Sequence, residues 1–181
     1  IAAIGGKKEL ETRLDTLFTT SSQIDGAEAS GDITGLIGQY AHGNEPSHHM
    51  DYLYNWTDSP WKGQEYLDYI MQNFYTNEPD GIIGNEDCGQ MSAWYVMSAL
   101  GFYQVSPGIP VYTLGRPMVN KASMHVKGRI FEIVATNNSP ANKYVKEVKL
   151  NGKVLKAPFI SHSDIINGGK LEFIMTDQPV K

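Results

Sequence analysis

Residues 81–107 read GIIGNEDCGQMSAWYVMSALGFYQVSP, and this stretch divides the chain into two kinds of structure. It opens with a glycine-rich loop that carries two adjacent carboxylates, Glu86 and Asp87. The loop leads into an apolar, aromatic segment that is typical of a buried helix over 90–100, and Gly101 is expected to end that helix. Beyond this stretch the helical period disappears. We therefore expect helices on its N-terminal side and strands on its C-terminal side.

Apolar residues recur at helical spacing before the stretch. Helices, including one short helical turn, are predicted over 7–18, 33–42, 48–56, 60–74 and 90–100. Ser59 and Pro60 have the composition of a helix start, with serine at the cap and proline at the first helical position. The helices carry wide apolar faces, which predicts either missing neighbours outside residues 1–107 or burial of these faces through oligomerisation.

Short runs rich in β-formers follow the stretch, separated by turn residues. Strands are predicted over 111–114, 118–126, 129–135, 145–150, 153–155, 159–161 and 170–175. Asn151-Gly152 is a strong signal for a two-residue hairpin. The predicted fold class is therefore α+β, with a helical segment over 1–107 and a mostly antiparallel β unit over 108–181.

The bulk composition narrows the classes of function. The chain has 181 residues and a net charge of −5. This acidic balance, without a cluster of lysine or arginine, argues against nucleic acid as a partner. The apolar runs are too short to span a bilayer. Cys88 is the single cysteine, which excludes an intramolecular disulfide and a cysteine-based zinc site.

The first residues, Ile-Ala-Ala-Ile-Gly-Gly, lack an initiator methionine and a basic region. They are unlike a signal peptide, and they suggest that the chain is a segment of a longer polypeptide.

A second group of polar residues stands at 43–49, where the sequence reads GNEPSHH. The oxygens of Asn44 and Glu45 suit a hard cation such as calcium. His48 and His49 are adjacent, so on a helix their side chains would point about 100° apart and would not easily bind one ion. Each histidine alone is also compatible with an ordinary core or surface position.

Glu45 and Asp87 lie in separate glycine-containing loops, and each loop immediately precedes a predicted helix. Such loops gather at one end of a helical barrel, so we expect the two carboxylates to meet in one pocket, less than ~15 Å apart. Two carboxylates in one pocket would serve calcium binding or glycoside hydrolysis. The alternative is that the acids at 86–87 only cap the following helix.

The two motifs, 43–49 and 84–95 with its extension to Gly108, resemble glycoside hydrolase family 92, and the similarity runs through most of the chain. The resemblance implies a calcium-dependent, exo-acting bacterial α-mannosidase that inverts the anomeric configuration. The family combines an N-terminal β-sandwich with an (α/α)6 barrel, so residues 1–107 would form part of the barrel. It also implies mannose-containing glycans as substrates, the remainder of the parent polypeptide as a partner, and a periplasmic or secreted location.

The resemblance further implies roles for individual residues. Asn44 and Glu45 match the calcium-binding pair, and Asp87 matches the general base, with Glu86 as the reserve candidate. The expected sugar contacts are His48, His49 and Trp94.

Nothing before Gly43 matches the surroundings of the family's general acid, so we expect the isolated chain to be inactive. The alternatives are a non-catalytic carbohydrate-binding module and a scaffold domain whose acids are helix caps.

Overall fold

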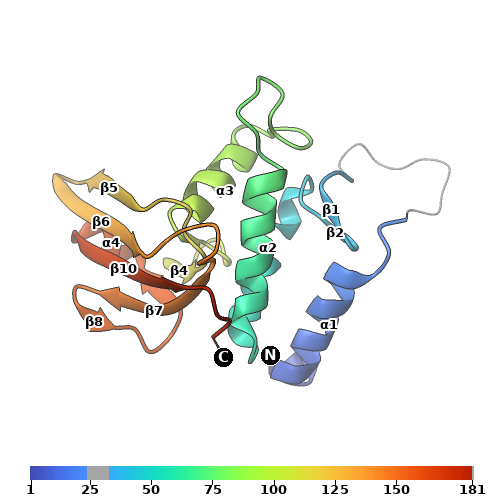
Figure 1. The fold of residues 1–181 in the computed structure, drawn as a ribbon, viewed down its shortest axis with the longest axis horizontal. Coiled ribbons are helices and arrows are strands. Elements are labelled where there is room, and N and C mark those ends of the chain that lie inside the picture. The colour runs from blue at the N-terminus through green and yellow to red at the C-terminus, as the bar shows by residue number, and fades with distance from the viewer. Residues whose placement is uncertain (24–32, 181) are drawn as a thin grey trace.

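The computed structural model describes residues 1–23 and 33–180. The helical layer contains η1 (Ala2–Ile4), α1 (Lys7–Thr19), β1 (Leu36–Ile37), β2 (Tyr40–Ala41), η2 (Glu45–Ser47), η3 (Asp51–Trp56), α2 (Pro60–Asn73) and α3 (Gln90–Ala99). The β unit contains β3 (Phe102–Tyr103), β4 (Val111–Leu114), β5 (Lys121–Val126), β6 (Arg129–Thr136), β7 (Tyr144–Leu150), β8 (Lys153–Val154), β9 (Phe159–Ser161), α4 (His162–Ile166) and β10 (Gly169–Thr176). Figure 1 shows α2 between α1 and the β unit.

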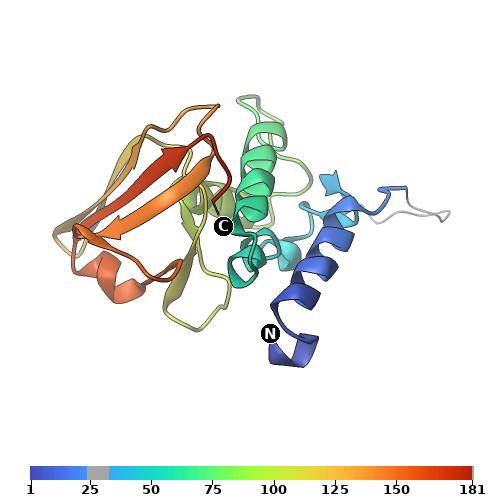
Figure 2. The ribbon, with the colours of Figure 1, turned by 60° about the horizontal axis from the view of Figure 1, so that its bottom comes forward.

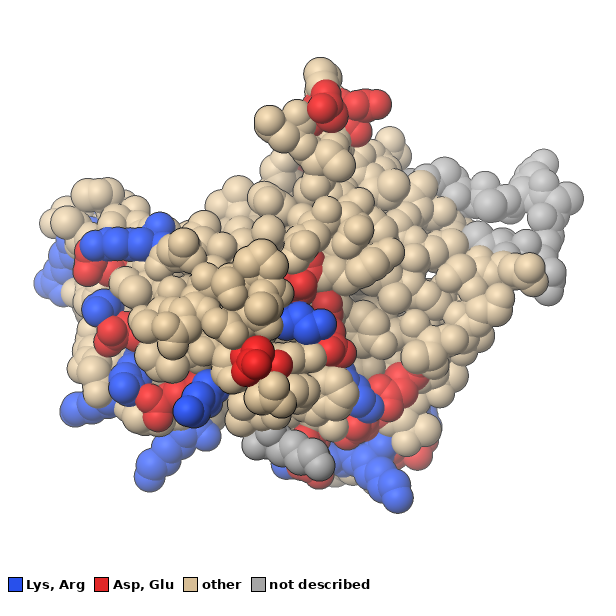
Figure 3. Space-filling model, viewed as in Figure 1, with Lys and Arg blue, Asp and Glu red and all other residues tan. Residues whose placement is uncertain are grey.

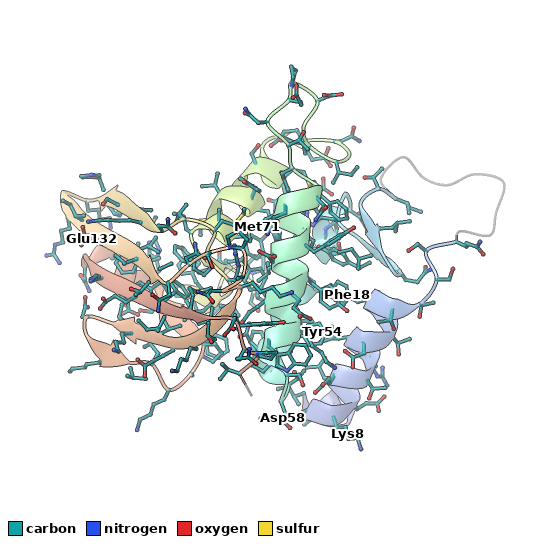
Figure 4. All side chains as sticks on the ribbon, viewed as in Figure 1. Lys8, Phe18, Tyr54, Asp58, Met71 and Glu132 are labelled. Atoms are coloured by element: carbon teal, nitrogen blue, oxygen red, sulfur yellow. The ribbon has the colours of Figure 1, made fainter. Side chains whose placement is uncertain are left out.

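The predicted α+β class is confirmed, and the three long helices lie where the apolar spacing places them. Leu10, Leu14 and Phe18 form the buried face of α1. Phe18 and Tyr54 face each other in Figure 4, with ring centroids 6.0 Å apart, so α1 packs on η3 through aromatic contacts. Pro60 opens α2 as predicted, although the Ser59 side chain makes no capping hydrogen bond.

Two predictions for the first half of the chain are wrong. Residues 33–42 form the β1–β2 hairpin and no helical turn. Gly38 turns this hairpin with a φ of 60°, and a Cβ there would lie 2.5 Å from the carbonyl oxygen of Leu17. The helix expected over 48–56 is a 3-10 helix that begins at Asp51.

The β unit contains a five-stranded sheet in the order β5-β6-β10-β7-β8 and a three-stranded sheet in the order β3-β4-β9. Strands β7 and β10 run side by side in Figures 1 and 2, and most pairings are antiparallel, as predicted. The exception is β10, which pairs with β6 in parallel. Asn151 and Gly152 form the predicted hairpin turn with φ values of 51° and 79°.

Two apolar cores stabilise the two halves. One core lies between α1, η3, α2 and α3, and the other lies between the sheets and α4. The strand β3 precedes residue 108 and pairs with β4, so the helical layer and the β unit are joined through a shared sheet. The described helices form an open layer, and membership of an (α/α)6 barrel stays a prediction.

The junction between the halves is tight at Gly115. A Cβ at this position would lie 2.7 Å from Cδ1 of Leu67 and 2.9 Å from Cε1 of Tyr52. We expect Gly115→Ala to reduce the free energy of unfolding by about 1–3 kcal/mol, because the buried side chains of Leu67 and Tyr52 must shift in a packed core to admit the methyl group. Thermal unfolding measures this loss of stability.

The control is Gly108→Asn, because a Cβ at this position would have nothing within 4 Å and asparagine tolerates the positive φ. An unchanged Tm for Gly115→Ala would contradict the packing.

Charged side chains do not suggest a polyanionic partner. In Figure 3 the lysines and arginines on the visible face are interspersed with aspartates and glutamates. Within residues 1–23 and 33–180, the helices are all too short or too polar to cross a membrane.

Candidate active site

The loops that precede η2 and α3 open onto one cavity of about 590 Å³. Its lining combines two acids, two imidazoles, two amides, an aromatic ring and apolar groups: Glu45, Pro46, His48, His49, Asp87, Gln90, Tyr103, Gln104, Val105 and Pro107. The two motifs of the sequence, separated by more than thirty residues, therefore meet at one place.

Glu45 supplies an unusual acceptor to this cavity. It is the first residue of η2, and its Oε1 atom is buried without a hydrogen-bond partner among the described residues. A buried carboxylate oxygen is normally hydrogen-bonded or bound to a cation, because leaving it unpaired costs free energy. Glu45 therefore has the environment of a metal ligand or of a residue that receives a donor from a bound molecule.

Asn44 precedes Glu45 as the residue at the N-terminal boundary of η2. Its backbone carbonyl accepts hydrogen bonds from the amide and the hydroxyl of Ser47, which holds the loop. Its side chain is exposed and does not line the cavity. The structure thus brings Glu45 and Asp87 to one cavity, and the Asn44 side chain lies outside its lining.

Asp87 reaches the cavity through a strained backbone. Asp87 and Cys88 have φ values of 48° and 57°, which non-glycine residues adopt at a cost, between Gly84 and Gly89, which also have positive φ. Asp87 and Glu45 line the same cavity. The interaction with Glu45, followed by burial, raises the pKa of Asp87 above its usual value. Glu45 and Asp87 thus share one cavity, as the sequence predicts.

Glu86 has a different environment from its neighbour. Its two carboxylate oxygens accept hydrogen bonds from the backbone amide of Ser92, at 3.1 Å, and from the Ser92 hydroxyl, at 3.0 Å. Because Ser92 lies in the first turn of α3, Glu86 satisfies a free amide at the helix N-terminus. The sequence offered the acids at 86–87 as possible helix caps, and the structure places Glu86 in that role.

His48 forms a rigid part of the cavity wall. Its Nε2 atom donates to the carbonyl oxygen of His42, at 3.0 Å, and its Nδ1 atom lies 3.3 Å from Nε2 of Gln90. Burial lowers the pKa of His48, which favours the neutral ring. With both ring nitrogens engaged, His48 is not free to bind a metal ion. His49, half-buried, also lines the cavity.

Trp94 lies behind the wall. Its side chain is fully buried, and its Nε1 atom donates to the carbonyl oxygen of His48 at 2.9 Å. The ring also packs on His42 and Tyr75. The Trp94 side chain therefore does not reach the cavity, and the expected contact between it and a sugar is wrong. It contacts the backbone of His48 from the apolar core instead.

A series of buried, hydrogen-bonded polar side chains lies behind His48. His42 is hydrogen-bonded to the hydroxyl groups of Tyr40, at 2.9 Å, and Tyr75, at 2.7 Å. Burial lowers the pKa of His42 to about 3, so its ring is neutral. Because His42 also presents its carbonyl to His48, this chain fixes the cavity wall from behind. Sequence reasoning missed His42.

Sequence reasoning also missed Gln90 and Tyr103 as cavity residues. The available signals were their positions: Gln90 is the first residue of the helix that follows the acidic loop, and Tyr103 follows the helix-ending Gly101. Gln90 begins α3, whereas Tyr103 follows its C-terminal end. The two side chains meet only because the chain turns back after α3 and forms β3.

The donor set fits a calcium ion in part. In the part of the chain that the structure describes, no group of three or more histidine, cysteine, aspartate or glutamate side chains is arranged to hold a metal. Glu45 and Asp87 nevertheless supply oxygens, and two ionised carboxylates this close repel each other unless a cation or proton is present. Calcium takes six to eight oxygen ligands, so backbone carbonyls, water, substrate or other parts of the protein would have to complete its shell.

Comparison with known proteins identifies what the chain resembles. Residues 1–177 match the model of the glycosyl hydrolase family 92 catalytic domain. A family GH92 α-mannosidase from Bacteroides thetaiotaomicron is 44% identical, with a TM-score of 0.88, and the alignment covers 97% of this chain and 23% of that one. The structure of the same enzyme in complex with mannoimidazole gives a TM-score of 0.90.

Two further relatives agree. A family GH92 inverting mannosidase from the same bacterium is 34% identical, with a TM-score of 0.81, over 98% of this chain and 25% of that one. An uncharacterized secreted glycosidase from Arthroderma benhamiae is 28% identical over 137 residues, which are 74% of this chain and 18% of the relative. The chain thus spans about a quarter or less of the length of these proteins.

Proposed function

Because the chain belongs to glycosyl hydrolase family 92, we propose that it supplies one side of the active site of an inverting, calcium-dependent exo-α-mannosidase. The substrates are terminal α-mannosides of glycans, and the whole enzyme acts in the periplasm or outside the cell. The observation that carries the proposal is the meeting of Glu45 and Asp87 in one cavity. The relatives named as α-mannosidases, one of them inverting and one in complex with mannoimidazole, support the substrate and the stereochemistry.

Asp87 acts as the general base in this proposal. In an inverting hydrolysis a water oxygen forms a bond to the anomeric carbon while the bond to the leaving oxygen breaks. Asp87 takes the proton of that water as its bond to the anomeric carbon forms. It is exposed at the cavity mouth, where water reaches it.

The leaving oxygen needs a proton from a general acid that lies ~6.5–9.5 Å from the base. Nothing before Gly43 matches the surroundings of that acid, so the remainder of the parent polypeptide supplies it. Without it the rate falls by a factor of roughly 10²–10⁴. The isolated 181-residue chain is therefore inactive on unactivated substrates.

Asn44 and Glu45 would hold the calcium ion. A bound calcium ion supplies charge stabilisation and fixes the orientation of the sugar. Glu45 would contribute its buried oxygen, which has no partner among the described residues, and the exposed Asn44 side chain would add a neutral oxygen. His48 and His49 then form the wall against which the sugar lies, and Trp94 holds His48 in place.

Glu86 serves the fold and not the chemistry. We expect Glu86→Ala to lower the free energy of unfolding by about 1 kcal/mol, through loss of the cap on α3. The kcat of the full-length protein for an aryl α-mannoside should change less than about threefold, well below the loss that removal of a general base causes. Thermal unfolding and steady-state rates measure the two effects. A large loss of kcat with unchanged Tm would transfer the base role to Glu86.

The function is tested by incubating the full-length protein with 4-nitrophenyl α-mannoside, with and without a calcium chelator. We expect release of nitrophenol that the chelator abolishes and calcium restores. Mannoside binding without turnover would instead support the carbohydrate-binding module. Failure both to bind and to hydrolyse would leave the acids as helix caps and would overturn the proposal.

A further inference from the structure

We propose that Gln90 and Tyr103 form a matched acceptor and donor that recognises one hydroxyl group of the bound sugar. This inference rests on the proposed function, since it assigns a role to two further residues of the same cavity. Both residues line the cavity beside Asp87 and His48, and they are hydrogen-bonded to each other at 3.1 Å.

The orientation of the Gln90 amide follows from His48. A backbone carbonyl can only accept a hydrogen bond, so the Nε2 atom of His48, which lies 3.0 Å from the carbonyl of His42, carries the proton. In the neutral ring Nδ1 is then an acceptor. The group of Gln90 that lies 3.3 Å from Nδ1 must therefore be its NH₂.

The same NH₂ group lies 3.1 Å from the hydroxyl oxygen of Tyr103. Since an amide NH₂ can only donate, the Tyr103 oxygen is the acceptor in this contact and keeps its own proton for another partner. Neither Oε1 of Gln90 nor the Tyr103 proton has a partner within residues 1–23 and 33–180. The pair thus offers one free acceptor and one free donor.

A sugar hydroxyl is the ligand group that matches this pair, because it donates one hydrogen bond and accepts others. The pair is also held in place before a ligand arrives. The Tyr103 ring stacks on Tyr52 with centroids 5.6 Å apart, and the Tyr52 hydroxyl donates to Ser98 at 2.8 Å. Groups positioned in advance discriminate strongly against an analogue that lacks their partner, because they are left unpaired.

The test uses the full-length protein and five substrates: an aryl α-mannoside and its analogues deoxygenated at C2, C3, C4 or C6. Tyr103→Phe removes the hydroxyl group that offers the donor, and with it the acceptor of the Gln90 NH₂. Gln90→Met removes the amide that offers the acceptor, at similar size, and with it the NH₂ contacts to His48 and Tyr103. Tyr95→Phe is the matched control, because Tyr95 lies on α3 but lines a different cavity, with Tyr75 and Ile82. The measured quantities are kcat/KM and the affinity for the corresponding methyl glycosides, determined by calorimetry.

We expect each cavity variant to lower kcat/KM for the α-mannoside about tenfold, as loss of one hydrogen bond predicts. On one deoxy analogue, the same for both variants, the loss should vanish, because the hydroxyl that they recognise is absent. Tyr95→Phe should match the unsubstituted protein throughout. Equal losses on all five substrates, or different analogues for the two variants, would overturn the inference while leaving the mannosidase function intact. A protein that neither hydrolyses nor binds any mannoside would overturn both.

Discussion

Replacement of Asp87 by asparagine in the full-length protein should lower kcat for an aryl α-mannoside by a factor of about 10²–10⁴. Asparagine keeps the size and most of the hydrogen-bonding capacity of aspartate, but it cannot accept a proton from water at neutral pH. It also tolerates the φ of 48° at this position, so the loop should keep its shape. The affinities for calcium and for a mannose-based inhibitor should therefore remain largely unchanged, which calorimetry measures.

The matched control for this variant is Asp80→Asn, which makes the same chemical change at an exposed position outside the cavity. It should leave kcat unchanged. A full retention of kcat in Asp87→Asn would remove Asp87 from the chemistry. A parallel loss of kcat and of inhibitor affinity would make Asp87 a binding group instead of a base.

Glu45→Gln should weaken calcium binding by roughly 100-fold or more. Loss of a residue that only supports a ligand costs roughly 10–100-fold in metal affinity, and loss of the charge of a direct ligand should cost at least the upper end of that range. The substitution replaces the buried carboxylate, whose Oε1 atom is unpaired in the described structure, by a neutral amide. Activity at low calcium should fall accordingly. Excess calcium should restore part of it, because the remaining oxygens still bind the ion when its concentration is high.

Restoration of activity by excess calcium distinguishes the role of Glu45 from that of Asp87. Calcium should restore activity to Glu45→Gln and not to Asp87→Asn. Glu78→Gln, an exposed glutamate in the loop between α2 and α3, serves as the control and should need no added calcium. If calcium rescues both cavity variants equally, the roles of base and ligand are wrongly assigned. If Glu45→Gln has full activity in the presence of chelator, Glu45 binds no essential ion.

Local sequence signals predicted much of this fold. The apolar spacing of Leu10, Leu14 and Phe18 defines a helix face regardless of what it packs against, and α1 lies where that spacing places it. Asn151-Gly152 defines its hairpin for a similar reason, since both residues accept positive φ. Gly101, with a φ of 96°, ends the helical segment as expected.

Long-range contacts decided what the sequence did not predict. The hairpin over 36–41 exists because Gly38 can approach the backbone of α1, a contact that no local period encodes. The parallel pairing of β10 with β6 joins strands that are separated by β7, β8, β9 and α4. The boundary between the helical segment and the β unit at 107/108 remains a prediction.

In the site, too, local sequence signals predicted some features and long-range contacts decided others. The motifs themselves predicted that Glu45 and Asp87 would meet. The distinct environments of Glu86 and Asp87 depend on the left-handed backbone at Asp87, which turns one carboxylate to the cavity and leaves the other at the start of α3. The burial of Trp94 depends on the core formed by His42 and Tyr75 around it. Neither feature is visible in residue spacing.

The central claim is that Asp87 activates the attacking water on the face opposite the leaving group. The direct measurement is the NMR identification of the product that Asp87→Gly forms from 2,4-dinitrophenyl α-mannoside in the presence of azide. Glycine accepts the left-handed backbone without strain, and the vacated space admits azide as the nucleophile. The account predicts that azide accelerates turnover and that the product is β-mannosyl azide. Formation of the α-azide, or hydrolysis as fast as that of the unsubstituted protein, would contradict it.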